Sequence, residues 1–384
     1  MIKKRLVIEL RGVDFVNKGA ELMLNAIRTI LLERYPDIIF VMQKNPRAPA
    51  AELNKNNIYI KFLFRNFRVK WENVAYFLPR TLLLNRNYVL PQDIDLVLDG
   101  SGFAFGDQWG AQYAQKRLGN DIAKWKNEGK KVILLPQAFG PFNDEALHEV
   151  MKKIINHSDL IFAREKQSYE YMNGINASPK IKLAPDFTNL ISGVIPKDFD
   201  ATKNDVAIIP NYKMIEKILS KEEYLAFLNE TIQALLENGK QPYFLIHEGE
   251  KDRSIAEEAN ARLAKPISLF HYANPLAVKG IISTASFIIC SRFHGVVSAL
   301  SQGVPCLATS WSHKYEMLME EYGYPEGVIK DLKDFDNLKN KINELSNPDK
   351  RKEISQRLKD NSAIQKKRSK EAWEQIFDFI NNIN

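Results

Sequence analysis

The sequence predicts an α/β protein made of two Rossmann-like domains that face each other across a cleft. Short apolar runs, typical of buried parallel strands, alternate with segments of helical periodicity. This alternation occurs in two series, which are separated by a stretch without periodicity. A chain of 384 residues is also longer than one ordinary hydrophobic core requires, and its length is typical of two domains.

The first series is expected within residues 1–191. Helical patterns at 19–34, 108–128 and 143–156 alternate with apolar runs, which is the rhythm of βαβ units and a parallel sheet. The predicted strands cover residues 6–10, 38–41, 94–98, 132–135 and 160–163.

The second series is expected within residues 205–347, with helices at 221–238, 252–264 and 275–283. Its predicted strands cover residues 206–209, 243–246, 267–270, 287–290 and 305–308. The stretch 192–204 contains Gly193 and Pro196 and is interpreted as the linker between the domains. Residues 348–384 form a long charged helical pattern. We expect this helix to return to the first domain and to pack there through Trp373, Ile376 and Phe377.

A segment at about 61–90 interrupts the first series. It mixes aromatic side chains with six basic residues, and Glu72 is its only acid. Basic and aromatic residues in alternation are typical of elements that rest on an anionic membrane surface. The alternative is an insertion whose aromatic side chains fill the core or a dimer interface. The sequence leaves both alternatives open, and with them the oligomeric state.

Composition limits the class of protein and of partner. Apolar residues make up 45% of the chain and no run of about 18 apolar residues occurs, so no membrane span is expected. The apolar stretch after Arg5 is cut by Glu9 and Arg11, so it is too short for a signal peptide. We therefore expect a cytoplasmic protein, at the inner face of the membrane if residues 61–90 bind there. The net charge of +7 suits an anionic partner, but no nucleic-acid-binding motif is present.

The two cysteines, Cys290 and Cys306, both lie in apolar runs. Buried free thiols are expected for them, and no metal site is expected because no other ligands cluster nearby.

The segment Ser291–Gly295 is the strongest candidate for a binding site. It lies between the predicted strand 287–290 and a helical pattern that follows it. Ligands of parallel α/β sheets bind at the carboxyl ends of the strands, and a helix N-terminus favours an anion. Arg292 and His294 are therefore candidates for binding and proton transfer. The alternative is that His294 caps the helix and Arg292 ties down a loop.

Other strand ends carry further candidates. Asn17, Lys18 and Gly19 form the first strand-to-helix loop, which lacks the glycine patterns that bind NAD or ATP. Ser101 and Gly102 belong to a glycine-rich loop in which the backbone can approach a ligand closely.

Three charged residues could each act on a substrate or serve the structure. Asp107 could accept a proton or cap a helix. Arg164 could bind an anionic substrate or pair with Glu165 or Asp186, and Lys314 could bind an anion or form a salt bridge.

Several motifs, taken in order, resemble the polysaccharide pyruvyl transferase family. Ser291–Gly295, with Gly303-Val304-Pro305 and Lys314, resembles its C-terminal signature. The earlier motifs that resemble it are Asn17–Glu21, Asp99–Gly102 with Asp107, Pro136–Phe142, Arg164-Glu165 and Pro185-Asp186. The resemblance spans roughly residues 5–325. Ser101 departs from the pattern, since many relatives carry glycine there.

The resemblance implies a glycosyltransferase-B-like fold and a pyruvyl transfer reaction. Phosphoenolpyruvate would donate pyruvate as a cyclic ketal to two hydroxyls of a sugar, in a surface polysaccharide (an exopolysaccharide) or its lipid-linked precursor, and phosphate would be released. This chemistry requires no metal or redox cofactor.

The same resemblance implies roles for single residues. His294 would be the general acid, and Asp107 and Arg164 would be the other catalytic residues. Arg292 and Lys314 would bind the anionic donor, together with Asn17, Lys18, Gly19, Ser101, Gly102, Ser291 and Gly295. Two other functions stay open: a glycosyltransferase that uses a nucleotide sugar, and a non-catalytic module that binds a sugar phosphate.

Overall fold

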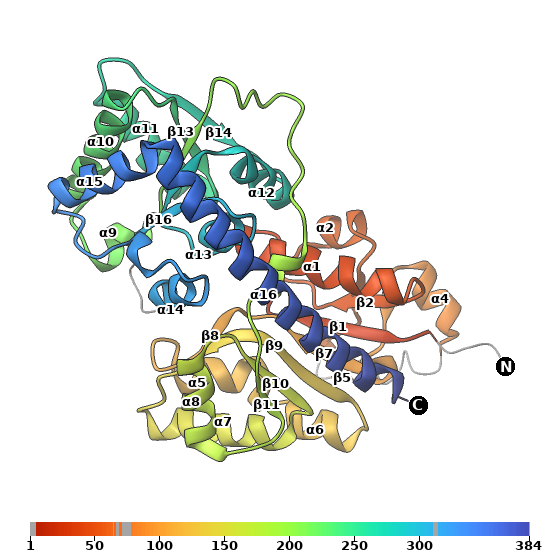
Figure 1. Cartoon of the computed structure of the whole chain (residues 1–384). Helices are drawn as coiled ribbons and strands as arrows, with labels where there is room; N and C mark the ends of the chain where they lie inside the picture. Colours follow the sequence, from red (N-terminus) through yellow and green to blue (C-terminus); the bar gives the residue numbers. More distant parts are fainter. Residues whose placement is uncertain (1–4, 64, 67–68, 71–77, 310–313, 384) are drawn as a thin grey trace. The chain divides into compact units, whose positions relative to one another are not determined.

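The computed structural model describes residues 5–63, 78–309 and 314–383, and the backbone of 65–66 and 69–70. By its contacts the chain divides into two compact units (Figure 1). Unit 1 comprises residues 1–16, 23–186 and 374–384, and unit 2 comprises residues 17–22 and 187–373. Each unit contains its own parallel sheet flanked by helices, which confirms the predicted pair of Rossmann-like α/β domains.

The main sheet of unit 1 consists of β1 (Val7–Arg11), β2 (Ile39–Met42), β3 (Tyr59–Lys61), β6 (Tyr88–Val89), β7 (Leu96–Asp99), β8 (Phe103–Phe105), β9 (Lys131–Phe139), β10 (Leu160–Ala163) and β11 (Ile181–Leu183). Their order is β11-β10-β9-β7-β1-β2-β3-β6, and β8 adds to β9. Strands β1, β7 and β9 are buried along nearly their whole length. This burial explains their continuous apolar sequences, because a parallel sheet is covered on both faces.

Helices connect these strands. They are α1 (Lys18–Arg34), α2 (Ala50–Lys55), α4 (Arg80–Asn85), α5 (Gly110–Ala114), the π-helical turn Gln115–Gly119, α6 (Ile122–Asn127), α7 (Glu145–His157) and α8 (Lys166–Asn176). Helix α7 shows why they form: the Asp144 side chain accepts a hydrogen bond from the backbone N–H of Ala146 at its start. Its apolar face, with Leu147, Met151 and Ile154, then packs into the core of the sheet.

The sheet of unit 2 consists of β12 (Val206–Ile209), β13 (Pro242–Ile246), β14 (Ser268–His271), β15 (Phe287–Cys290), β16 (Cys306–Thr309) and β17 (Val328–Ile329). Their order is β14-β13-β12-β15-β16-β17, with every pair parallel. Connections leave β12 and β15 in opposite directions, so these neighbours form a topological switch point. Ligands of such sheets bind at the carboxyl ends of the two strands beside that point.

The helices of unit 2 are α9 (Lys213–Lys217), α10 (Lys221–Glu237), α11 (Gly249–Ala261), α12 (Pro275–Thr284), α13 (Phe293–Leu300), α14 (Lys314–Glu321), α15 (Phe335–Ser346) and most of α16 (Pro348–Asn381). Helix α10 begins with a capping box between Ser220 and Glu223. The sequence shows this motif as a serine followed three residues later by a glutamate. The end of α16 belongs to unit 1, where Phe377 packs edge-on against Tyr35 with ring centroids 5.9 Å apart.

The division between the units differs in detail from the predicted boundaries. Unit 2 already begins at Phe187, and the stretch expected as a linker, 192–204, packs within it. The backbone N–H of Val194 donates to the carbonyl of Leu276 at 2.8 Å. Of the predicted C-terminal helix, residues up to Trp373 group with unit 2 and only the last eleven residues, 374–384, group with unit 1.

The segment 61–90 is described only in part, because residues 64, 67–68 and 71–77 lie outside the described residues. Its two ends belong to the main sheet, where β3 pairs with β6. The Lys61 ammonium is buried and lies 2.7 Å from a carboxylate oxygen of Glu9, so this lysine is not part of a membrane-binding surface. Arg80 pairs with Asp93 at 2.9 Å.

Among the described residues, no helix combines the length and the apolar character that crossing a membrane requires.

Candidate functional site

The predicted segment Ser291–Gly295 lies at the switch point of unit 2, directly after β15. Ser291 is buried and anchors the loop. Its carbonyl accepts hydrogen bonds from the Asn211 amide at 2.8 Å and the Tyr315 hydroxyl at 3.0 Å, and its hydroxyl bonds those of Tyr224 and Thr309. Through these hydrogen bonds Ser291 fixes the turn between β15 and α13 to the neighbouring elements of unit 2. In this structure all of its polar atoms are engaged within the protein.

Arg292 is the N-cap residue of α13, and two carboxylates hold its guanidinium. Nε and one terminal nitrogen bond the two oxygens of Asp252 at 2.8 and 2.6 Å, and the other terminal nitrogen bonds Glu248. Burial by itself would lower the pKa of Arg292, but the charges of Asp252 and Glu248 outweigh burial and raise it. The arginine expected to grip an anion is thus already engaged, and it fixes the start of α13.

His294 lies in the first turn of α13 and contacts the first turn of α1. A Cβ atom on Gly19 would lie only 2.3 Å from the His294 Nδ1. The backbone of Gly19 therefore touches the imidazole, and only glycine leaves room for the ring as it stands. The neighbouring Asn17 caps α1 by accepting a bond from Ala20 N–H, and its amide donates to Glu248 at 2.8 Å. Residues 17–22 thus belong to the site of unit 2, as their contacts show.

His247, at the end of β13, completes this cluster. A Cβ on Gly295 would lie 3.6 Å from the His247 ring, and 2.6 Å from the Cys290 sulfur. Burial lowers the pKa of His247 to about 3, with further lowering from the charges of Arg292, His294 and Lys18. His247 is therefore a neutral imidazole at physiological pH.

The remaining unit 2 candidates lie at helix starts. Lys18, in the first turn of α1, pairs with Glu21 at 2.6 Å. Lys314 is the first residue of α14, and its ammonium lies over the rings of Phe293 and Tyr315 at 5.2 and 5.7 Å from the centroids.

In unit 1, Ser101 and Gly102 lie at the corresponding switch point, between β1 and β7. A Cβ on Gly12 would lie 2.5 Å from the Ser101 backbone nitrogen, so the loops that follow the two strands touch. The Ser101 hydroxyl bonds Asp99 at 2.5 Å and accepts a bond from Arg117 at 2.7 Å. Gln137 donates to the same Asp99 carboxylate at 3.2 Å. Asp99 and Gln137, which are buried, and the partly buried Arg117 thus form a polar network beside this loop.

Asp107 and Arg164 are both engaged by neighbours within unit 1. The Asp107 carboxylate accepts bonds from the backbone and side-chain amides of Asn143, at 3.0 and 2.8 Å, and it holds the turn before α7. It does not cap α5, whose N-cap residue is Trp109. Arg164 is buried and its guanidinium lies 3.3 Å from Asp186, which is the ion pair considered as its alternative role.

The structure thus brings Asn17, Lys18, Gly19, Ser291, Arg292, His294 and Gly295 together in unit 2, and Ser101 and Gly102 in unit 1. Glu248 and Asp252 were missed, although Glu248 follows a strand end just as Arg292 does. Among the described residues, no three His, Cys, Asp or Glu side chains are grouped as metal ligands.

Comparison with known proteins identifies the family. The family model of polysaccharide pyruvyl transferases matches residues 17–313, most of the chain and nearly all of the motifs described above. The chain belongs to the polysaccharide pyruvyl transferase family. Membership indicates a transferase that acts in polysaccharide biosynthesis.

The fold of this pyruvyl transferase family member is shared with solved glycosyltransferase-B proteins. Anabaena HepE in complex with UDP and glucose is similar over 98% of this chain and 100% of that chain, at 12% identity and a TM-score of 0.59. Staphylococcus aureus MnaA with UDP matches over 98% and 97%, at 13% identity and a TM-score of 0.59. A glycosyltransferase from Rickettsia africae matches over 99% of both chains, at 13% identity and a TM-score of 0.58. At such identities the likeness confirms the predicted glycosyltransferase-B-like fold alone.

Proposed function

We propose that the chain transfers a pyruvyl group from phosphoenolpyruvate to two hydroxyls of a sugar, in a surface polysaccharide or its lipid-linked precursor. One observation carries the proposal: His294 and Gly19 join the first turns of α13 and α1 at the switch point of unit 2. Two helix N-termini, which favour a phosphate or carboxylate, thus adjoin an imidazole that can donate a proton. Family membership supports the same reaction.

The proposed chemistry assigns each proton and bond. His294 protonates the methylene carbon of the donor, which becomes a methyl group, and C2 becomes electrophilic. One sugar hydroxyl adds to C2 and passes its proton to Asp107, the proposed acceptor. Phosphate then leaves with the electron pair of its C–O bond and takes the proton that Asp107 accepted. The second hydroxyl adds to C2, closes the cyclic ketal and gives its proton to His294, which is thereby regenerated as the acid. A positioned acid such as His294 contributes about 10²–10⁴ in rate. No oxidant, reductant or metal takes part in the proposed steps.

The ion pairs refine the roles proposed for the binding residues. Because Arg292 is held by Asp252 and Glu248, we assign it the role of fixing the first turn of α13. Lys18 and Lys314 remain the proposed cations for the donor. Arg164 is paired with Asp186, so it would bind the donor while it keeps this ion pair. The two buried free thiols support a reducing, cytoplasmic location for the reaction.

Glu248 provides a test of where the donor binds. Its carboxylate bonds both Arg292 and Asn17, so it occupies hydrogen-bond donors that suit an anionic substrate. In Glu248→Gln the repulsion between this carboxylate and the donor is gone, and we expect the KM for phosphoenolpyruvate to fall by about threefold to tenfold. Steady-state kinetics would measure it. Glu250→Gln, an exposed change in α11, should leave the KM unaltered.

The decisive experiment is a thermal-shift titration of the full chain with phosphoenolpyruvate and, in parallel, with a panel of nucleotide sugars. A ligand at 100 times its Kd stabilises the folded state by about 2.7 kcal/mol. We expect phosphoenolpyruvate to raise the melting temperature of the wild type and His294→Ala to weaken that shift. A shift with a uridine or guanosine sugar alone would replace this proposal with a nucleotide-sugar glycosyltransferase.

Turnover completes the test of His294. We expect His294→Ala to abolish ketal formation while the variant stays folded, because the donor carbon then has no acid. Retained turnover would remove His294 as the acid. Arg164→Ala is harder to interpret, since it removes a buried ion pair with Asp186 and is therefore expected to destabilise unit 1.

A further inference from the structure

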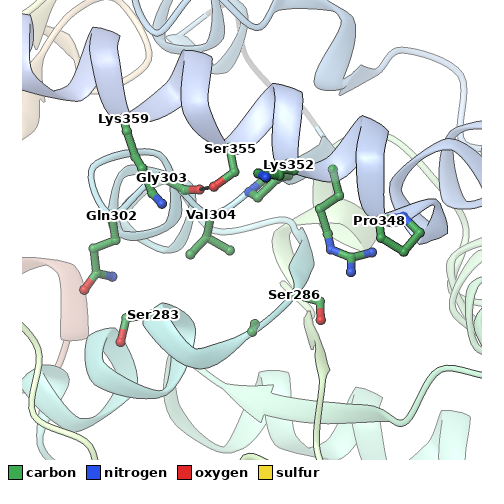
Figure 2. A pocket seen from close by; sticks show the side chains of 12 residues that line it. Ser283, Ser286, Gln302, Gly303, Val304, Pro348, Lys352, Ser355 and Lys359 are labelled. Atoms are coloured by element: carbon green, nitrogen blue, oxygen red, sulfur yellow. Dashed lines mark hydrogen bonds between the residues drawn. The ribbon is translucent and has the colours of Figure 1, made fainter.

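A basic pocket lies at the amino edge of the unit 2 sheet (Figure 2). It has a volume of about 330 Å³ and lies between α16 and the ends of α12 and α13. Ser286, which lines it, directly precedes β15, whereas His294 follows the other end of that strand. A strand of four residues spans about 13 Å at 3.3 Å per residue, so the pocket and the proposed active site lie at opposite edges of the sheet.

The lining is polar and carries positive charge. Arg351, Lys352 and Lys359 reach it from α16, and the hydroxyls of Ser283, Ser286 and Ser355 belong to its wall. Figure 2 shows Lys352, Ser355 and Lys359 along one helix, with Ser283 and Ser286 on the other side. None of the described residues that line the pocket is acidic. The pocket is thus suited to an anion rather than to an apolar ligand.

Lys352 and Lys359 are not required as hydrogen-bond donors to the protein's own carbonyl groups. Carbonyl groups at the rim already have donors: the Ser355 hydroxyl bonds the Gly303 carbonyl at 2.6 Å, and the Ser283 hydroxyl bonds that of Gly280 at 2.6 Å. Arg351 bonds the carbonyl of Leu345 at 2.8 Å, at the end of α15. Within the described part of the chain, Lys352 and Lys359 form no ion pair and no hydrogen bond. Both ammonium groups are therefore available to a ligand.

We propose that this pocket binds a compact ligand that carries a phosphate or diphosphate group. Two ammonium groups and a guanidinium can neutralise a doubly charged oxyanion. Among the lining serines, the Ser286 hydroxyl can donate to one of its outer oxygens, because those of Ser283 and Ser355 already donate to carbonyl groups. The site is separate from the one proposed for pyruvyl transfer and does not depend on that reaction. The same chemistry could be presented by a free phosphorylated metabolite or by a phosphate headgroup on a lipid.

Isothermal titration calorimetry of the full chain with inorganic pyrophosphate tests the free form of the ligand. We expect Lys352→Ala/Lys359→Ala to weaken binding by about tenfold or more, since each lysine supplies a charge-assisted bond. Lys352→Arg/Lys359→Arg should retain binding. The matched control is Lys367→Ala/Lys370→Ala, which removes the same charge from exposed positions of α16 outside the pocket and should bind as the wild type does.

Titration of His294→Ala separates this pocket from the active site. The pocket proposal requires that His294→Ala still binds pyrophosphate and that the pocket variant loses this binding. Cosedimentation with vesicles of phosphatidylcholine, with and without phosphatidic acid, tests the lipid form. Vesicle binding that depends on Lys352 and Lys359, without binding of pyrophosphate, would assign a lipid headgroup. Wild-type affinity in the pocket variant, or no binding of either probe, would overturn the proposal.

Discussion

At the scale of single residues, the contact between Gly19 and His294 ties the proposed acid to the first helix of the chain. In Gly19→Ala the new methyl group would meet the imidazole at 2.3 Å, so the ring must turn away. We expect kcat to fall by about tenfold to a hundredfold, because a small misplacement of a reacting group is costly. Stability should not fall to the same degree, since alanine favours a helix over glycine by about 1 kcal/mol. Kinetics and thermal unfolding would measure the two effects.

Gly174→Ala is the matched control for this variant. Gly174 also lies within a helix, α8, and a Cβ there would meet nothing within 4 Å. It should gain a little stability and keep full activity. An active Gly19→Ala enzyme would show that the position of the imidazole seen here is not the one that matters for turnover.

His247 gives the stability of unit 2 a defined pH dependence. Its pKa is lowered by burial to about 3 in the folded state, against about 6.5 when exposed. Between these values the unfolded chain binds the extra proton, so stability falls as the pH decreases from about 6.5 towards 3. The slope is about 1.4 kcal/mol per pH unit. Urea unfolding at several pH values should show this loss, and His247→Asn should remove that share of it.

The control for this experiment is His148→Asn. His148 is far more exposed, with 38% of its side chain accessible, and lies on α7 in unit 1. Because it belongs to unit 1, its replacement should leave the loss of stability of unit 2 at low pH as it is in the wild type. If His247→Asn keeps the wild-type slope as well, the buried imidazole is not the group that titrates on unfolding.

Residue types at strand ends were predictable, but their partners were not. The sequence places Ser291, Arg292 and His294 after a buried strand, and the structure agrees with that placement. It could not show that Asp252, forty positions away, holds Arg292, because that contact exists only once β13 and β15 flank β12. Asp107 is similar, since its partner Asn143 lies beyond the whole of β9.

At the scale of elements, α12 is crossed closely by the chain that precedes β12. A Cβ on Gly280 would lie 2.3 Å from the Val194 carbonyl carbon and oxygen, and one on Gly193 would lie 2.1 Å from the Gly280 nitrogen. These neighbours are backbone atoms and cannot rotate away. We expect Gly280→Ala to destabilise unit 2 by about 2 kcal/mol, despite the better helix propensity of alanine. Denaturant unfolding would measure this.

The same Gly174→Ala variant provides the comparison, because it adds an identical methyl group to a helix with space around it. A Gly280→Ala protein as stable as the wild type would mean that residues 193–195 move aside without loss. The stretch would then be the loose linker that the sequence suggested, rather than a segment packed on α12.

The long strands were predictable from their apolar sequences, while short and irregular elements were not. Strand β9 continues to Phe139, although the sequence predicts its end at residue 135. Pro136 interrupts the pattern because it has no N–H to donate. The sheet accommodates it with a shift of register between β9 and β10 at this place. Strands β6 and β17 have only two residues, too few to show a period.

At the scale of the whole molecule, α16 belongs to both units, and its last turns complete the core of unit 1. Phe377 is 6% exposed, packs on Tyr35, and lies under the Arg34 guanidinium at 4.4 Å. We expect Phe377→Ala to destabilise unit 1 by about 3 kcal/mol through the cavity it leaves. In scanning calorimetry the transition of unit 1 should move to a lower temperature, and that of unit 2 should move less.

Ile364→Ala is the control on the same helix. The Ile364 side chain is 56% exposed within the part of α16 that belongs to unit 2, so its truncation should change neither transition. Equal losses in both transitions of Phe377→Ala would contradict the assignment of residues 374–384 to unit 1, and would instead show that the two units melt as one.

The two cysteines allow the opening of unit 2 to be measured by thiol labelling. Cys290 and Cys306 are the only cysteines in the sequence, and both lie in the centre of that unit. Burial raises the pKa of the Cys290 thiol to about 12 and that of Cys306 well above its usual value, so neither is a reactive thiolate in the folded state. A thiol-specific dye can therefore label the protein only when this sheet opens. The rate of labelling then measures how often unit 2 opens. Opening of unit 1 does not contribute to this rate, because unit 1 contains no cysteine.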